Sequence, residues 1–322
     1  MTFFVKRFLI KVYLENMINR KLAIVIPYFK NEYFRECLES LEKQNDNRFN
    51  VYIGDDSSPQ DPWILINSSQ KKLNITYKRF DKNLGSISLT QQWERCLGMI
   101  NGEEWIMLLC DDDVLSENVV NSFYKNLDEI EDAKSKVVKF ASQVVDEYGK
   151  PVTEKYCHPK LQDYRDVFYD RFFNANRSSL SEHIFRRTSF QKYGFHDYPL
   201  AWHADDMAWL EFSEFGKIYS INEACVYFRS SAIHLSRSDF LLEEKRDTTY
   251  LFFNNVIYEY LENFNQYQIT AILKRYELLT FSFKKVNFNF VFQFFRLKLK
   301  HEGIYEALKF IRRICINRKE LK

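Results

Sequence analysis

The sequence has only eight glycines in 322 residues, and none of them forms a GxGxxG motif. Dinucleotide-binding dehydrogenases need those glycines so that the backbone can approach a pyrophosphate, and this class of enzyme is therefore disfavoured. A sugar-nucleotide nucleotidyltransferase should also carry a glycine-rich loop after its first strand. This chain reads PYFKNE at that place, which disfavours the second class as well.

Cysteine pairs and long apolar runs are also missing. The six cysteines are scattered without a CxxC pair, which disfavours zinc and disulfide frameworks and predicts reduced thiols in a cytoplasmic protein. No window offers the roughly 18 uncharged apolar residues that a membrane span requires. Near the start, Lys6, Arg7 and Lys11 interrupt the apolar residues and no cleavage site follows. We interpret residues 1–20 as an N-terminal extension and not as a signal peptide.

A large excess of charge of one sign is absent, because 46 Lys and Arg face 44 Asp and Glu, a net charge of +2. This balance disfavours a protein dedicated to nucleic acid. Basic residues are nevertheless concentrated after residue 274, where they alternate with aromatics, and only Gly303 follows Gly216. Residues 239–322 are predicted to be almost uninterrupted helix. This tail is either an interfacial segment on anionic lipid or a helical subdomain with a solvated basic face.

Short apolar runs alternate with helical patterns in the first part of the chain. The runs that we predict to be strands are 22–27, 51–54, 75–80 and 105–110. Leu89, Trp93 and Leu97 recur at helical spacing, and Asn31 and Ser116 are expected to cap two further helices. This alternation predicts an α/β fold with a doubly wound, mostly parallel sheet flanked by helices, and a helical C-terminal extension.

Acidic and polar residues follow three of the predicted strands, at 28–32, 55–58 and 111–113. The carboxyl ends of parallel strands meet at one edge of a sheet, so these clusters are expected to share a crevice. Within the triplet 111–113, a like-charge pair at 4 Å costs about 4 kcal/mol at an effective dielectric constant near 20. A divalent cation such as Mg²⁺ or Mn²⁺ would relieve that repulsion. The alternative is a solvated turn that caps the next helix.

A further acidic pair, Asp205 and Asp206, stands at the start of the amphipathic stretch HADDMAWLEF. The simplest interpretation is that the pair stabilises the positive end of a helix dipole. The functional alternative is a general base, because a partly buried carboxylate beside a second one has a raised pKa.

In order and spacing, these motifs resemble those of the family 2 glycosyltransferases with the GT-A fold. The matching segments are LAIVIPYFKNEYFRECLESL, VYIGDDSSPQD, NLGS, EEWIMLLCDDDVLSEN and HADDMAW. The resemblance implies a nucleotide-sugar donor, a Mn²⁺ or Mg²⁺ cofactor and inversion at the anomeric carbon. It also implies a catalytic domain at 21–238, with a nucleotide-sugar-binding half at 21–135 and an acceptor half at 136–238, followed by the helical region 239–322.

The resemblance implies roles for single residues on the donor side. The residues that would bind the nucleotide-sugar are Pro27, Tyr28, Glu32, Asp55, Asp56, Asn83, Gly85 and Asp111. Asp112 would be the main metal ligand, with Asp113 beside it, and one alignment places Cys110 at the first position of the metal motif. His234 would be an additional ligand, with a hydrogen-bonded structural histidine as the alternative.

On the acceptor side, the resemblance assigns the general base to Asp206, with Asp205 as the second candidate. Trp202, just before the pair, would stack against the acceptor. The predicted activity is inverting transfer of a hexosyl or N-acetylhexosaminyl group from a nucleotide-sugar, most commonly a UDP-sugar, to a glycan hydroxyl. A lipid-linked acceptor at the inner face of the cell membrane, in bacterial surface polysaccharide synthesis (O-antigen, lipopolysaccharide or capsule), would suit the basic tail. The alternatives are an inactive glycan-binding or assembly subunit and the nucleotidyltransferase.

Overall fold

The structure is a computed structural model that describes residues 21–230, 241–283 and 285–317. The chain divides into two compact units, Met1–Ser238 and Asp239–Lys322. The N-terminal extension at 1–20 and His234 lie outside the described residues.

The first unit is built on a nine-stranded sheet in the order β3-β2-β1-β4-β8-β6-β9-β5, with β7 paired to β9. Its strands are β1 Leu22–Tyr28, β2 Phe49–Asp55, β3 Ile75–Arg79, β4 Trp105–Leu108, β5 Val114–Leu115, β6 Val137–Val145, β7 Leu161–Asp163, β8 His183–Arg186 and β9 Lys217–Arg229. The β3-β2-β1-β4 part is parallel throughout, as the alternation of strands and helices predicts. Beyond β4 the sheet is mixed, because β8 runs antiparallel to both of its neighbours.

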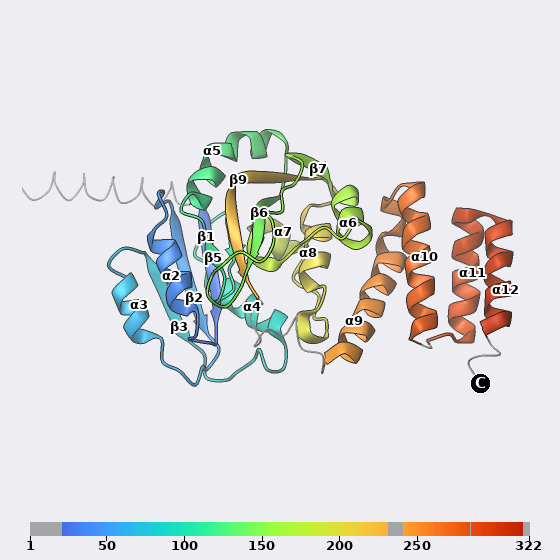
Figure 1. Cartoon of the computed structure of the whole chain (residues 1–322), viewed down its shortest axis with the longest axis horizontal. Helices are drawn as coiled ribbons and strands as arrows, with labels where there is room; N and C mark the ends of the chain where they lie inside the picture. The colour runs from blue at the N-terminus through green and yellow to red at the C-terminus, as the bar shows by residue number, and fades with distance from the viewer. Residues whose placement is uncertain (1–20, 231–240, 284, 318–322) are drawn as a thin grey trace, which may run out of the picture. The chain divides into compact units, whose positions relative to one another are not determined.

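Helices cover both faces of this sheet (Figure 1). They are α2 Phe34–Glu42, α3 Trp63–Ser69, α4 Leu89–Leu97, α5 Val119–Asp132, α6 Tyr164–Phe173, α7 Arg187–Tyr193 and α8 Ala204–Phe212, with short 3-10 turns η1 Leu180–Glu182 and η2 Pro199–Ala201. Leu22, Ile24 and Ile26 of β1 join one buried core with apolar residues of α2, α3 and α5. Burial of each such side chain contributes about 1.5–3 kcal/mol. The predicted α/β class with flanking helices is confirmed.

Two helix starts depart from the sequence-based expectations, and one glycine explains a close packing contact. The N-cap position of helix α5 is Asn118, without a side-chain capping bond, and not Ser116, whose hydroxyl instead accepts a hydrogen bond from the Cys225 amide of β9 at 2.9 Å. Helix α2 likewise begins after Tyr33 and not after Asn31. Gly54 of β2 allows α4 to approach closely, because a Cβ at this position would lie 2.2 Å from the sulfur of a cysteine on α4.

The second unit is helical, as predicted, although its helices are interrupted. Its elements are α9 Leu242–Asn255, the π-helical turn η5 Val256–Tyr260, the 3-10 turn η6 Leu261–Asn263, α10 Gln266–Ser282, α11 Phe288–Glu302 and α12 Ile304–Asn317. Asn265 and Asn287 cap α10 and α11 with their side chains, and Gly303, at φ 85°, allows the turn into α12. None of the described helices in the chain has the length and apolar character needed to cross a membrane.

Candidate active site

Three loops at the carboxyl ends of β1, β2 and β4 are bonded to one another. The amides of Phe29 and Lys30, which follow β1, both donate to Oδ2 of Asp111 at 2.9 Å. The Ser58 hydroxyl, after β2, donates to the Phe29 carbonyl at 2.7 Å. The first three predicted polar clusters are therefore brought together at one edge of the sheet.

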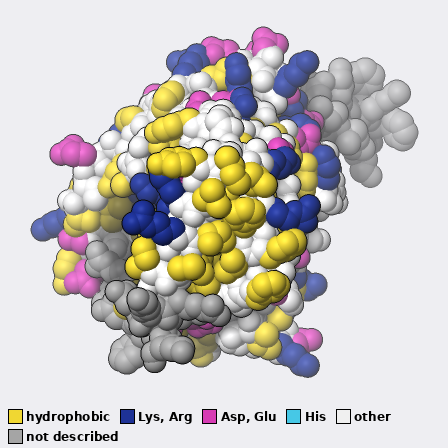
Figure 2. Space-filling model, turned by 90° about the vertical axis from the view of Figure 1, so that its right-hand side faces the viewer, with side chains coloured by type: hydrophobic (Ala, Val, Ile, Leu, Met, Phe, Trp, Pro, Cys, Tyr) yellow, Lys and Arg dark blue, Asp and Glu magenta, His cyan; other side chains and the backbone are white. Residues whose placement is uncertain are grey.

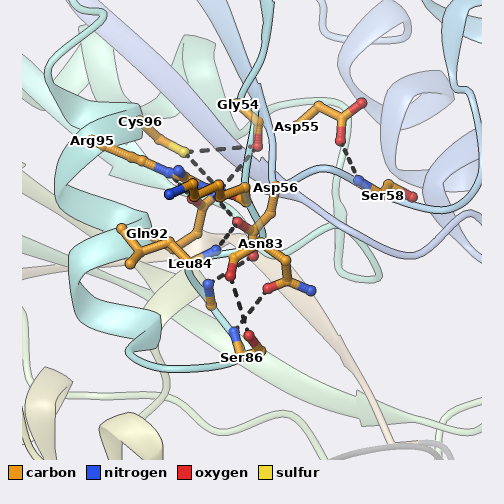
Figure 3. A network of polar contacts seen from close by, with 12 residues as sticks. Gly54, Asp55, Asp56, Ser58, Asn83, Leu84, Ser86, Gln92, Arg95 and Cys96 are labelled. Carbon is orange, nitrogen blue, oxygen red and sulfur yellow. Dashed lines mark hydrogen bonds and ion pairs between the residues drawn. The ribbon is translucent and has the colours of Figure 1, made fainter.

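Asp56 fixes the loop between β3 and α4 (Figure 3). Its carboxylate accepts the amide of Leu84 at 2.7 Å and that of Gly85 at 2.8 Å, and it forms an ion pair with Arg95 of α4. Within the same loop, Asn83 accepts the amide of Ser86 at 2.9 Å through its side-chain oxygen. Asp56 thus holds Asn83 and Gly85, two other predicted donor-site residues, against the end of β2.

Asp55 is also fully buried and fully engaged. It accepts hydrogen bonds from the Ser58 amide at 2.8 Å and the Tyr77 hydroxyl at 2.7 Å, and it is paired with Arg79 at 2.8 Å. Because Asp55 ends β2 and its partners come from β3 and the loop after β2, it gives this part of the site its rigidity.

The remaining predicted donor-site residues lie around the β1 loop. Tyr28 is fully buried, with its ring centroid 4.5 Å from that of Phe34, and its hydroxyl donates to the Gln60 carbonyl. Its side chain therefore belongs to the core. Pro27 is partly exposed and Glu32 is exposed, so both offer surface to a ligand.

One group of donors in the described part of the chain is compact enough to share a cation. Ligand atoms of Cys110, Asp112 and Asp113 all lie within 4.8 Å of one another. Asp113 is buried, and Oδ1 accepts the amide of Arg229 at the end of β9 at 3.0 Å. The Arg229 guanidinium donates to the Asp112 carbonyl at 3.1 Å and is ion-paired with Glu36. Its charge is therefore partly balanced by Glu36, a carboxylate outside the triplet.

The chemistry of these donors fits a hard divalent cation. Burial and then the charge of Asp113 keep the pKa of the Cys110 thiol well above its usual range, and a soft sulfur is a poor match for a hard cation. The carboxylate oxygens of Asp112 and Asp113 are the donor type that Mg²⁺ and Mn²⁺ prefer. Burial and the charge of Asp112 also raise the pKa of Asp111 to about 6. Within the triplet, the charge of Asp112 therefore opposes the ionisation of Asp111.

The acidic pair at the start of α8 is asymmetric. Asp206 is buried, accepts Nε of Arg171 at 2.9 Å and contacts Nδ1 of His203 at 2.7 Å. Burial raises the pKa of Asp206, but Arg171 and His203 outweigh burial and hold that pKa well below its usual range. Burial and then the negative charge of Asp206 raise the pKa of the neighbouring Asp205 to about 7.

Two contacts attach the part of the chain between β7 and α8 to the donor side of the sheet. Asp197, ahead of α8, accepts hydrogen bonds from Thr90 at 2.6 Å and Gln91 at 2.9 Å, at the start of α4. The hydroxyl of Ser181 in η1 accepts the Cys110 amide at 3.0 Å. Trp202 is partly exposed, with its ring centroid 5.4 Å from that of His203. The acidic pair and Trp202 thus lie in a segment tied to the loop that Asp56 holds.

The family model described as glycosyl transferase family 2 matches residues 23–194, more than half of the chain. The chain belongs to this family. Among solved structures, it is similar to S. aureus TarS 1–349 in complex with UDP-GlcNAc, at 17% identity and a TM-score of 0.62, over 86% of this chain and 79% of that one. No curated protein matches the sequence.

A second solved structure with a similar fold is the mannosyltransferase PcManGT from Pyrobaculum calidifontis in complex with GDP-Man and Mn²⁺. It is 11% identical, with a TM-score of 0.51, over 79% of this chain and 74% of that one. The expected GT-A fold and the resemblance to family 2 are both confirmed.

Sequence reasoning missed the basic residues that hold the carboxylates of this family 2 glycosyltransferase. Arg95 and Arg171 pair with Asp56 and Asp206 across 39 and 35 positions of sequence, so no local pattern marks them. Asp197 was missed for the same reason, since its partners precede it by more than 100 positions. His203 is the exception, because its place two residues before the acidic pair was a usable signal.

We expect Asp56→Asn to destabilise the protein by about 2 kcal/mol, because an amide can neither balance the Arg95 charge nor accept from both backbone amides. Urea unfolding measures this loss. Asp61→Asn is the matched control, since Asp61 accepts one amide in an exposed turn and has no ion pair in the described part of the chain. Equal stability of the two variants would contradict the role of Asp56 in holding the loop.

Proposed function

We propose that this glycosyltransferase moves a sugar from a nucleotide-sugar, with a UDP-sugar as first choice, to a hydroxyl of a glycan, with inversion. The observation that carries the proposal is a set of hydrogen bonds. They join the triplet 111–113, through the loop after β1, to the loops that Asp55 and Asp56 hold. Two proteins of similar fold have UDP-GlcNAc and GDP-Man bound. These complexes support a nucleotide-sugar as donor, and the first of them favours uridine.

Asp112 and Asp113 would hold Mn²⁺ or Mg²⁺ in this proposal. A cation bound there would counter the negative charge that develops on the departing diphosphate. Asp111 keeps the β1 loop in place through the amides of Phe29 and Lys30, so that Pro27 and Glu32 face the donor. Asp56 holds the segment with Asn83 and Gly85, which would contact the nucleotide.

The acidic pair would supply the base. The acceptor oxygen forms a bond to the anomeric carbon, the bond from that carbon to the diphosphate oxygen breaks, and the hydroxyl proton passes to a carboxylate. The resemblance gives this role to Asp206, but its contacts with Arg171 and His203 make it a weak proton acceptor. We therefore assign the proton to Asp205, whose pKa of about 7 suits general base catalysis, and a positioning role to Asp206.

Trp202 and the partly exposed surface beside His203 are the proposed contacts for the acceptor glycan, because an aromatic ring stacks well on a sugar face. A lipid-linked oligosaccharide of a bacterial surface polysaccharide is the acceptor class that we favour. It would meet the enzyme at the inner face of the cell membrane, where the basic helices of the second unit suit anionic lipid.

The proposal is tested by incubating the full chain with UDP- and GDP-sugars in the presence of Mn²⁺. We expect a UDP-sugar to raise the melting temperature and to release UDP, since a ligand stabilises the folded state that binds it. Binding without release, even with a glycan acceptor, would indicate a binding subunit. A melting temperature unchanged by every nucleotide-sugar would overturn the proposal.

A further inference from the structure

The outer face of helices α11 and α12 exposes large apolar side chains. The members of this α11/α12 face are Phe288, Phe292 and Leu299 on α11 and Ile304, Tyr305, Leu308 and Ile316 on α12. Phe288 is 87% exposed and Leu308 is 56% exposed. Figure 2 shows hydrophobic side chains gathered beside lysine and arginine on the face that it draws. Contiguous apolar surface of this kind marks an interaction site.

This surface is separate from the core of the helical unit. Phe288 and Phe292 are four residues apart and Leu299 follows at seven, a spacing that places all three on one side of α11. The opposite side of α11 buries Phe290 and Phe294. On α12, Ala307 and Phe310 are buried while Leu308 between them is exposed. Each helix therefore packs one side into the core of the helical unit and exposes a second apolar side.

The charges around the α11/α12 face are mainly positive. Arg296 and Arg312 are exposed on it, and neither is in an ion pair among the described residues. Two carboxylates of this unit are turned inward instead. Glu277 and Glu302 are almost fully buried and pair with Lys298 at 3.4 and 2.6 Å. Of the carboxylates nearer the face, Glu306 pairs with Lys309 and Glu262 with Lys300.

We propose that the α11/α12 face docks on an anionic lipid bilayer. Its apolar side chains would enter the boundary between headgroups and acyl chains, and the two arginines would pair with lipid phosphates, each adding about 1 kcal/mol. A second copy of the chain fits less well, because a two-fold contact between identical faces would bring their arginines together. The proposed docking on lipid does not depend on the reaction. Only its use in reaching a lipid-linked acceptor rests on the proposed function.

Vesicle flotation with the full chain tests the proposal. We expect binding to phosphatidylcholine vesicles that contain about 30% phosphatidylglycerol, much weaker binding to pure phosphatidylcholine, and a loss of binding at high salt. Arg296→Glu with Arg312→Glu should weaken binding by about tenfold or more, and Phe292→Ser with Leu308→Ser should weaken it even at low salt. Lys71→Glu with Lys125→Glu, exposed lysines of the first unit, is the matched charge control and should float normally.

Each outcome of this experiment decides the proposal. If Leu308→Ser unfolds the chain, Phe288→Ser provides the apolar test, since the Phe288 side chain is almost fully exposed. Equal binding of the control and the arginine variant, or no binding by the natural sequence, would overturn the proposal. A dimer in light scattering that Phe288→Ser dissociates would assign the face to a second copy. Nucleoside diphosphate release without flotation would remove the docking alone, and flotation without release would remove only the proposed reaction.

Discussion

Asp112→Asn is expected to lower Mn²⁺-dependent glycosyl transfer roughly a thousandfold, because a metal ion supplies several kcal/mol of charge stabilisation at the departing diphosphate. Asp112 is a better test than Asp113. Asp113 is buried and accepts the Arg229 amide, so its replacement would also loosen the end of β9. Asp112 is partly exposed, and the Arg229 guanidinium donates to its backbone carbonyl, which asparagine retains.

Two measurements separate the loss of the metal from a general defect. Calorimetric titration with Mn²⁺ should show weaker binding to Asp112→Asn, while thermal unfolding without metal should change little. Asp132→Asn, an exposed carboxylate at the end of α5, is the control and should match the natural sequence in both. A variant with undiminished Mn²⁺ affinity and transfer rate would show that the cation, or the site itself, lies elsewhere.

Much of the fold could be predicted because its first half follows simple rules. Apolar runs bounded by polar residues became β1 to β4, and their parallel pairing follows from the helices that connect them. The strands after β4 could not be predicted in the same way. The antiparallel insertion of β8 beside β4 and the two-residue strand β5 depend on pairing with strands far along the chain. The cap at Asn118 was missed because Ser116 is held by Cys225, a contact that no local pattern contains.

The acidic residues of the site could be predicted, but their individual states could not. A carboxylate after a strand is visible in sequence, whereas its pKa depends on which residues bury it and which charges approach it. Tyr28 illustrates the same limit, because its neighbours along the chain do not reveal that Phe34 and Gln60 enclose its side chain. The acidic pair is the sharpest case, since two adjacent aspartates have pKa values displaced in opposite directions.

That displacement predicts different kinetics for the two aspartates. We expect Asp205→Asn to lower kcat by about 10²–10⁴, the usual contribution of a general base. In the natural sequence, kcat/KM should rise with pH and level off above about 7, where Asp205 loses its proton. Asp206→Asn should keep more activity and move this rise to lower pH, because removal of the Asp206 charge lowers the pKa of Asp205.

The free energy of unfolding provides a readout that is independent of activity. It should fall as pH rises, whereas kcat/KM should increase. The pKa of Asp205 is about 7 in the folded protein, against an ordinary value of 3.8. Between these values the folded state binds more protons than the unfolded state, so the free energy of unfolding falls as pH rises and is lowest above 7. Asp205→Asn removes this dependence. Urea unfolding should therefore find the variant more stable than the natural sequence at pH 8, by on the order of 2 kcal/mol, and equal to it near pH 4.

The opposite kinetic result would support Asp206 as the general base, the role that the family resemblance gives it. If Asp206→Asn abolished transfer while Asp205→Asn stayed active, the ion pair with Arg171 would have to open when donor and acceptor bind, freeing Asp206 to take the proton. Arg171→Gln distinguishes the two mechanisms. With Asp205 as the base, the loss of Arg171 should move the kinetic pKa upward, because a positive charge near the pair has been removed. With Asp206 as the base, the same change should raise the rate at neutral pH, since the proton acceptor would no longer be held by a guanidinium.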